Sequence, residues 1–167
     1  MENKNIKSID SSQAGQIVEF LEKYNNHFNE IVDFLNKKQL KVLADDLIWL
    51  HDSLSDEQRL SMSGVSLENK RLELFESFGL NDYNSSQILE IIPEEYKGRF
   101  KLECVNMENS IDSIKTLNAS IIETIEKKIS IAESDLRNKG YSNPGRYDVA
   151  GSKVRIDDPD DGIIGNM

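Results

Sequence analysis

The two histidines, His27 and His51, are the side chains best suited to hold a metal ion or to move a proton at neutral pH. In a di-iron helical bundle, a glutamate stands three residues before each metal-binding histidine. Tyr24 and Ile48 occupy those positions here. The sequence also lacks an HExxH pattern, a Cys–His cluster, a glycine-rich phosphate loop and a GxSxG turn. We therefore expect no metal and no cofactor, and we expect both histidines to lie on helix surfaces or at the rim of a core.

An acidic run and a single cysteine are the remaining candidates for a metal site or for covalent chemistry. If Gly162 took the sixth position of a calcium loop, Asp157 would be the first and Pro159, which offers no carboxylate, the third. The bidentate glutamate of position twelve would fall beyond Met167, so the run is interpreted as a solvated acidic segment. Cys104 lies on an apolar row of a predicted helix, where a small core residue is expected. We expect a protein that is not an enzyme.

Composition and charge exclude several classes of partner. The 167 residues are 38% apolar and 30% charged, with a formal net charge of −10. Residues 138–167 carry 4 basic and 5 acidic side chains, so most of the acidic excess belongs to the preceding chain. An acidic body argues against nucleic acid and against an anionic membrane surface. The polar first residues lack a signal-peptide core, and no apolar run approaches the ~20 residues of a membrane span. We expect a cytoplasmic protein without membrane insertion.

The longest predicted helix covers about residues 93–137. Pro93 and the two acidic residues after it suit a first helical turn. Apolar residues then follow at alternating steps of four and three, the coiled-coil period. This row comprises Phe100, Cys104, Met107, Ile111, Ile114, Asn118, Ile121 and Ile125, of which Asn118 alone is polar. A second row comprises Leu117, Ile122, Ile129 and Leu136. Because the stripe is wider than one seam, more than one neighbour must cover it.

Two earlier helices are predicted at about 13–43 and 47–78, with a short one at 87–92. The first has an apolar row with the same steps of four and three: Ile17, Leu21, Tyr24, Phe28, Ile31 and Leu35. Asp45 or Asp46 can cap the start of the second, and Gly79 can end it. The second helix is expected to turn these residues inward: Leu47, Leu50, Leu54, Val65, Leu72 and Phe75.

The middle of the 47–78 helix has polar or small residues, Gln58, Ser61 and Gly64, at or near inward positions. Either this stretch makes a close helix crossing or packs poorly, or the bundle opens here. The predicted fold class is all-α: an elongated antiparallel three-helix bundle, or coiled-coil rod. We expect residues 1–12 to be a flexible N-terminus. Residues 138–167, rich in glycine and proline, are expected to be a flexible, disordered C-terminal tail.

The order of these elements and several short motifs carry a family resemblance. The motifs are KKQLKVLADDL at 37–47, KRLELFESFGL at 70–80, ILEIIP at 88–93, the Leu117–Asn118 pair midway along the third long helix, and a final segment with glycine and tyrosine. Over about residues 13–150 the chain resembles the FlgN family of flagellar export chaperones. The segment after about Val149 shows no pattern of that family.

The resemblance implies a cytoplasmic chaperone for hook-associated proteins, which form the hook–filament junction. It would bind their amphipathic terminal segments, prevent premature assembly and deliver them to the flagellar type III export gate. Such segments are apolar and disordered when free, and a groove between helices can hold their apolar face. The candidate client-binding residues are Ile111, Ile114, Ile121, Ile122, Ile125 and Ile129. For each one taken alone, an ordinary core isoleucine is the simpler interpretation.

The resemblance also implies that a C-terminal tyrosine docks on the export gate protein. Tyr147 and Tyr141 are the candidates, and a solvated tyrosine is the alternative for each. A second hypothesis from another class is a self-assembling coiled-coil adaptor. It would use the same apolar rows for homo-oligomerisation, so a homodimer stays open as a further partner.

Overall fold

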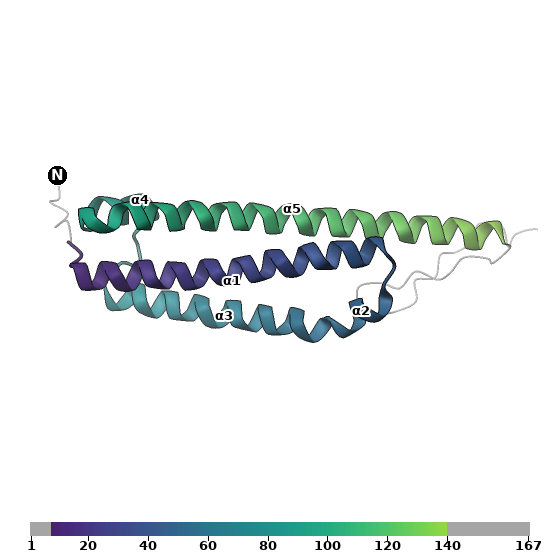
Figure 1. Ribbon diagram of the computed structural model, residues 1–167, viewed down its shortest axis with the longest axis horizontal. Helices are drawn as coiled ribbons and strands as arrows, with labels where there is room; N and C mark the ends of the chain where they lie inside the picture. Colours follow the sequence, from purple (N-terminus) through teal and green to yellow (C-terminus); the bar gives the residue numbers. More distant parts are fainter. Residues whose placement is uncertain (1–7, 140–167) are drawn as a thin grey trace, which may run out of the picture. The chain divides into compact units, whose positions relative to one another are not determined.

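The computed structural model describes residues 8–139, and within this range the chain forms helices and no β-strand (Figure 1). The helices are α1 (Ser11–Leu43), α2 (Leu47–Asp52), α3 (Leu54–Ser77), α4 (Ser85–Ile91) and α5 (Glu94–Asn138). The predicted all-α helical bundle is confirmed. The largest difference from the predicted boundaries is at Ser53, which separates α2 from α3 where the sequence predicts one continuous helix.

Contacts along the chain define two compact units. The first ends at Thr124 and contains α1 to α4 and about two thirds of α5, while the second starts at Ile125. In the second unit, the described residues are the end of α5 and Lys139. No helix in the described range is long and apolar enough to cross a membrane.

The start of α1 is more ordered than the sequence predicts. Asp10 caps the helix by accepting a 2.8 Å hydrogen bond from the backbone N–H of Gln13, whose side chain accepts one in return from the N–H of Asp10. Ile9 is buried, and its backbone N–H donates to the carbonyl of Ile91. For residues 8–12 the expectation of a flexible N-terminus is therefore wrong, because an apolar anchor and a capping box hold them.

Helix α1 lies between α3 and α5 in the first unit (Figure 1). Tyr24 pairs with Glu68 of α3 and Lys38 pairs with Glu57, so α3 runs antiparallel to α1. Against α5 the order is parallel, since an earlier residue of α1 meets an earlier residue of α5. The two α1–α5 contacts that show this are Asn25 with Glu103 and Gln39 with Ser120.

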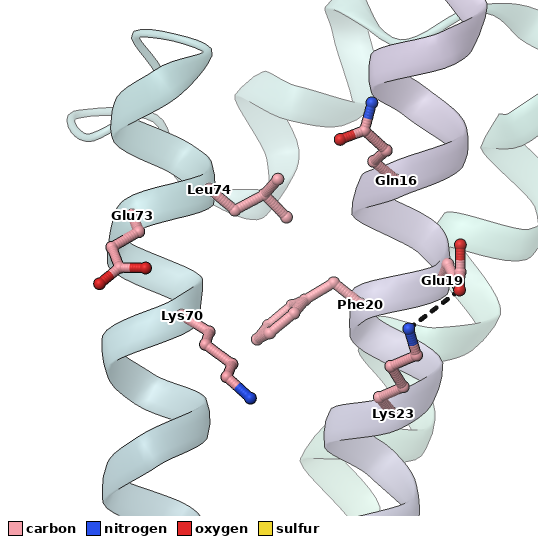
Figure 2. A pocket seen from close by; sticks show the side chains of 7 residues that line it. All are labelled: Gln16, Glu19, Phe20, Lys23, Lys70, Glu73 and Leu74. Carbon is pink, nitrogen blue, oxygen red and sulfur yellow. Dashed lines mark hydrogen bonds and ion pairs between the residues drawn. The ribbon is translucent and has the colours of Figure 1, made fainter.

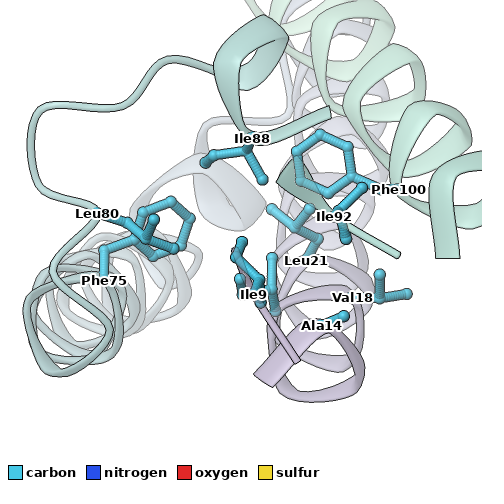
Figure 3. Packing of buried hydrophobic residues seen from close by; sticks show 10 residues of the cluster. Ile9, Ala14, Val18, Leu21, Phe75, Leu80, Ile88, Ile92 and Phe100 are labelled. Atoms are coloured by element: carbon cyan, nitrogen blue, oxygen red, sulfur yellow. The ribbon is translucent and has the colours of Figure 1, made fainter. Parts of the chain in front are cut away.

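A first apolar core joins the N-terminal half of α1 to the turn after α3, to α4 and to the start of α5 (Figure 3). Its buried members are Ile9, Ala14, Ile17, Val18, Leu21, Phe75, Leu80, Ile88, Ile92 and Phe100. Gly79 adopts φ 62°, the left-handed conformation that ends a helix at low steric cost, as the sequence predicts. The turn that follows places Leu80 fully inside this core.

A second apolar core lies farther along α1 and contains no residue of α3. Leu35, Val42 and Ile121 are its buried members. Partly buried residues of α1, α2 and α5 pack against them: Ile31, Phe34, Leu50, Ile114 and Leu117. In this part of the first unit, the described core is built by α1, α2 and α5 only.

The predicted inward row of the second long helix is largely wrong. Leu54, Val65 and Leu72 are 58%, 61% and 49% exposed, and Leu47 is exposed as well. Of the predicted residues, Phe75 is buried and Leu50 half-buried. The reason is that α3 contacts α1 through another face, which includes Leu60. Val65 follows Leu60 by five residues, and at about 100° per residue this places it about 140° away around the helix.

We predict that Leu80→Ala destabilises the protein by about 2–5 kcal/mol, because it removes a fully buried side chain and leaves a cavity. Urea unfolding followed by circular dichroism measures the change in the free energy of unfolding. The control is Leu47→Ala, which alters an exposed leucine and should stay within about 0.5 kcal/mol. Equal losses in the two variants would contradict the assignment of Leu80 to the core.

Candidate functional site

The predicted client-binding isoleucines fall into three groups. Ile121 is 4% exposed and packs with Leu35 and Val42, so it is a core residue and does not belong to an open surface. Ile111 and Ile114 are half-buried. Three remain on the surface: Ile122, Ile125 and Ile129, which are 56%, 38% and 53% exposed.

The exposed isoleucines follow each other at helical spacing. Ile122 belongs to the first unit, and Ile125 and Ile129 belong to the second. Steps of three and four residues place successive side chains on one face of an α-helix. Leu136, seven residues after Ile129, continues the row and is also partly exposed. We call Ile122, Ile125, Ile129 and Leu136 the α5 row.

The contact between α1 and α3 is close at Gly64. A Cβ atom at this glycine would lie 3.1 Å from Nε2 of His27. Of the two interpretations of this stretch, the close crossing holds at Gly64, whereas Gln58 and Ser61 are exposed. The crossing also covers His27, which is buried rather than at a surface or rim as predicted. His51 is exposed.

Two buried polar atoms in the described chain lack a hydrogen-bond partner: Nε2 of His27 and Oδ1 of Asn25. An unpaired buried group of this kind costs about 1–3 kcal/mol. The Asn25 amide does donate to Glu103, at 2.9 Å to its carbonyl and 2.6 Å to Oε2. Sequence patterns could not predict that either side chain is buried, because each lies where two helices meet.

A network of one tyrosine, one glutamate and one arginine ties α3 to α1. The Tyr24 hydroxyl donates to Oε2 of Glu68 at 3.1 Å, and Arg71 donates to both Glu68 oxygens at 2.9 and 2.8 Å. The hydrogen bonds from Arg71, and to a smaller extent that from Tyr24, lower the pKa of Glu68 from its ordinary 4.5, while partial burial opposes the shift. Burial raises the pKa of the Tyr24 hydroxyl. The hydrogen bond to Glu68 and the negative charge of that carboxylate raise it further, by smaller amounts.

Cavities flank α1 both on the side of α3 and on the side of α5. The cavity against α3 has a volume of about 460 Å³ and is lined by Gln16, Glu19, Phe20, Lys23, Lys70, Glu73 and Leu74 (Figure 2). Glu19 and Lys23 pair with each other at 2.9 Å. The cavity against α5 has about 560 Å³ and is polar, lined by Glu22, Asn25, Asn26, Asn29, Glu103, Asn106, Asn109 and Ser110.

The described residues offer no group of three or more His, Cys, Asp or Glu side chains that could hold a metal ion. Cys104 is half-buried, and burial raises the pKa of its thiol. The proposed docking tyrosines, Tyr141 and Tyr147, lie outside the described residues, as does the acidic run 157–162. For those three features the sequence-based expectations stay predictions.

Sequence reasoning missed an exposed apolar cluster at the α1–α2 turn. Leu40, Leu43, Leu47 and Ile48 are all more than half exposed. Beside them, Trp49 of α2 is half-buried, with the Lys37 ammonium 5.3 Å from its ring centre and the Phe34 ring 6.0 Å away. The sequence does place these four large apolar residues within nine positions. The prediction nevertheless assigned Leu47 to the core.

Comparison with known proteins identifies no relative: no family model, curated protein or solved structure matches the chain.

We predict that Gly64→Leu destabilises the protein by about 1–3 kcal/mol, because the new side chain must displace the buried His27 ring. The matched control is Gly98→Leu in α5, where a Cβ meets nothing within 4 Å. There the higher helix propensity of leucine should leave stability unchanged or raise it by up to about 1 kcal/mol. Thermal unfolding of both variants tests the crossing, and an unaffected Gly64→Leu protein would refute it.

We predict that Glu68→Gln lowers stability at pH 7 and that the difference from wild type shrinks as the pH falls below about 4.5. Because the pKa of Glu68 is lower in the folded state, its contribution exists above the unfolded value and is lost as the folded carboxylate becomes protonated. Urea unfolding from pH 3 to 7 measures it. The control is Glu30→Gln at an exposed position of α1, and equal pH profiles for the two variants would rule out the network's contribution.

Proposed function

We propose that this protein is a cytoplasmic chaperone of the FlgN type. In this role it binds the amphipathic terminal segments of hook-associated proteins, keeps them from assembling prematurely and delivers them to the flagellar type III export gate. The observation that carries the proposal is the α5 row, a series of large apolar side chains at helical spacing that remain in contact with solvent. The order of helices and motifs in the sequence supports the same assignment.

Burial of the α5 row supplies a driving force for binding. Covering a large aliphatic side chain contributes about 1.5–3 kcal/mol relative to leaving it in water. Ile122, Ile125 and Ile129 can therefore contribute several kcal/mol, although association and the ordering of a disordered client offset part of this. An amphipathic client helix suits the row because its own apolar face repeats at the same period.

Delivery to the export gate requires a second contact that leaves the client-binding surface free. Tyr147 or Tyr141 is proposed for this docking, because a tyrosine ring has an apolar face and a polar tip and anchors well in a partner's pocket. Both tyrosines follow α5 in sequence, so client and gate would contact different segments of the chain.

A self-assembling coiled-coil adaptor is the second candidate. The observation in its favour is the same α5 row, since its coiled-coil period would also suit a second copy of the chain. Sedimentation of the purified protein distinguishes the two functions. A stable oligomer that dissociates on Ile129→Asp favours the adaptor, whereas a monomer that binds client favours the chaperone.

We predict that the double variant Ile125→Asp/Ile129→Asp weakens client binding at least tenfold, a loss of about 1.4 kcal/mol or more. The physical reason is that two carboxylates would have to be desolvated against an apolar client face. Co-expression with a hook-associated protein, size exclusion and calorimetry with its terminal segments measure the effect.

The matched control for this double variant is Ile131→Asp. Ile131 is as exposed as Ile129 but lies two residues away, about 200° around the helix, and its substitution should leave affinity within twofold. Failure of the wild-type protein to co-elute with any hook-associated protein at micromolar concentration would rule out the proposed function.

A further inference from the structure

We propose that the second core opens on its own while the first core stays closed. In the open state, α2 and the facing segment of α5 separate from the end of α1, and the side chains of Leu35, Val42 and Ile121 come into contact with water. This inference does not rest on the proposed function, and it concerns residues of the first unit only.

The second core buries much less apolar surface than the first core. Within the described residues it has three buried side chains, whereas the first core has ten. Because the burial of apolar side chains is the dominant favourable contribution to helix packing, the smaller core separates at a lower cost in free energy. The turn after α3 and helix α4 cover the first core, and neither contributes a residue to the second core.

A polar interval on α1 and α5 separates the two cores. Asn25 donates to Glu103, and Ser110 donates to Asn29 at 3.2 Å. These four residues also line the polar cavity of about 560 Å³ between α1 and α5. Polar groups can exchange their partners for water at little net cost. An opening that ends at this interval therefore leaves the apolar contacts of the first core in place.

Helix α2 is attached weakly and lies between two breaks in the helical chain. None of its residues is buried, and Leu50 packs half-buried against the second core. Before α2, Asp45 adopts φ 55°, a left-handed conformation that few residues with a side chain adopt. After α2, Ser53 precedes α3 without giving it a side-chain cap. Changes in backbone angles at these two breaks would let α2 move without unwinding α1 or α3.

The second core is also incompletely packed when it is closed. A further cavity of about 520 Å³ lies beside it between α1 and α5, and Leu117 of the second core is part of the lining. At the outer end, the four large apolar side chains of the α1–α2 turn are more than half exposed. Closure of the second core therefore gains less than a fully packed interface of the same length would gain.

Hydrogen exchange of the folded full-length chain, measured for each backbone amide by NMR, tests the proposal. Amides at 118–121 of α5 should have protection factors about tenfold or more below those at 104–107, although both sets lie well inside the same helix. On α1, the amides near Leu35 should likewise be less protected than those near Leu21, which lies similarly far from a helix end. Equal protection in the paired segments would overturn the proposal.

Substitutions in the first core distinguish a separate opening from global unfolding. Leu80→Ala should lower the protection of first-core amides about tenfold or more, and leave that of second-core amides within about twofold. Ile88→Val is a milder change in the same core that makes the same comparison should Leu80→Ala not fold. If first-core substitutions lower protection in both cores by the same factor, the two cores open only together and the proposal is wrong.

Ile121→Ala is the matched variant in the second core. Because it removes buried side-chain atoms from that core, it should lower the protection of the amides at 118–121 about tenfold or more. Unchanged protection at these amides would mean that packing of the second core does not control their exchange, which would also contradict the proposal.

Discussion

The packing of α1 between α3 and α5 is the interaction on which the rest of the first unit depends. Helix α1 contains more of the buried side chains than any other helix of the described chain, and α3 and α5 each cover a different face of it. A helix in this position must be apolar over a wide angle, which the consecutive buried pair Ile17 and Val18 achieves. Its two neighbours, by contrast, need only a narrow apolar contact, so several of their large apolar side chains stay exposed.

The quality of this packing changes along α1. At one end, the turn after α3 and helix α4 cover the first core on several sides. They contribute the buried side chains of Leu80 and Ile88. Farther along, polar contacts such as Asn25 with Glu103 separate the first core from the second. The first core is therefore closed at one end of α1, whereas exposed apolar residues lie beyond it on α3 and α5.

The sequence predicted the helices well because their signals are local. The caps at Asp46 and Gly79 were recognisable from residue type, and the coiled-coil steps identified the long helices. It could not predict which side of α3 faces α1, since that choice depends on contacts between residues far apart in sequence. Helix α3 instead turns toward α1 the side that carries Gly64, which lies close to His27, and Glu68, which accepts from Tyr24. This side lies next to the apolar row that the sequence predicted to face inward. The same limit applies to the candidate site: the apolar stripe of α5 was found, but not that Ile121 is buried while Ile122 is exposed.

The shallow attachment of α3 has a consequence for how freely this helix can shift. Between Leu54 and Leu74 only Leu60 is buried, and ion pairs and a glycine make up much of the remaining contact with α1. A small sideways displacement of such a helix exposes little apolar area, so it costs little free energy. Helix α3 can therefore shift sideways against α1 at low cost, while the spacing of the residues along it stays fixed.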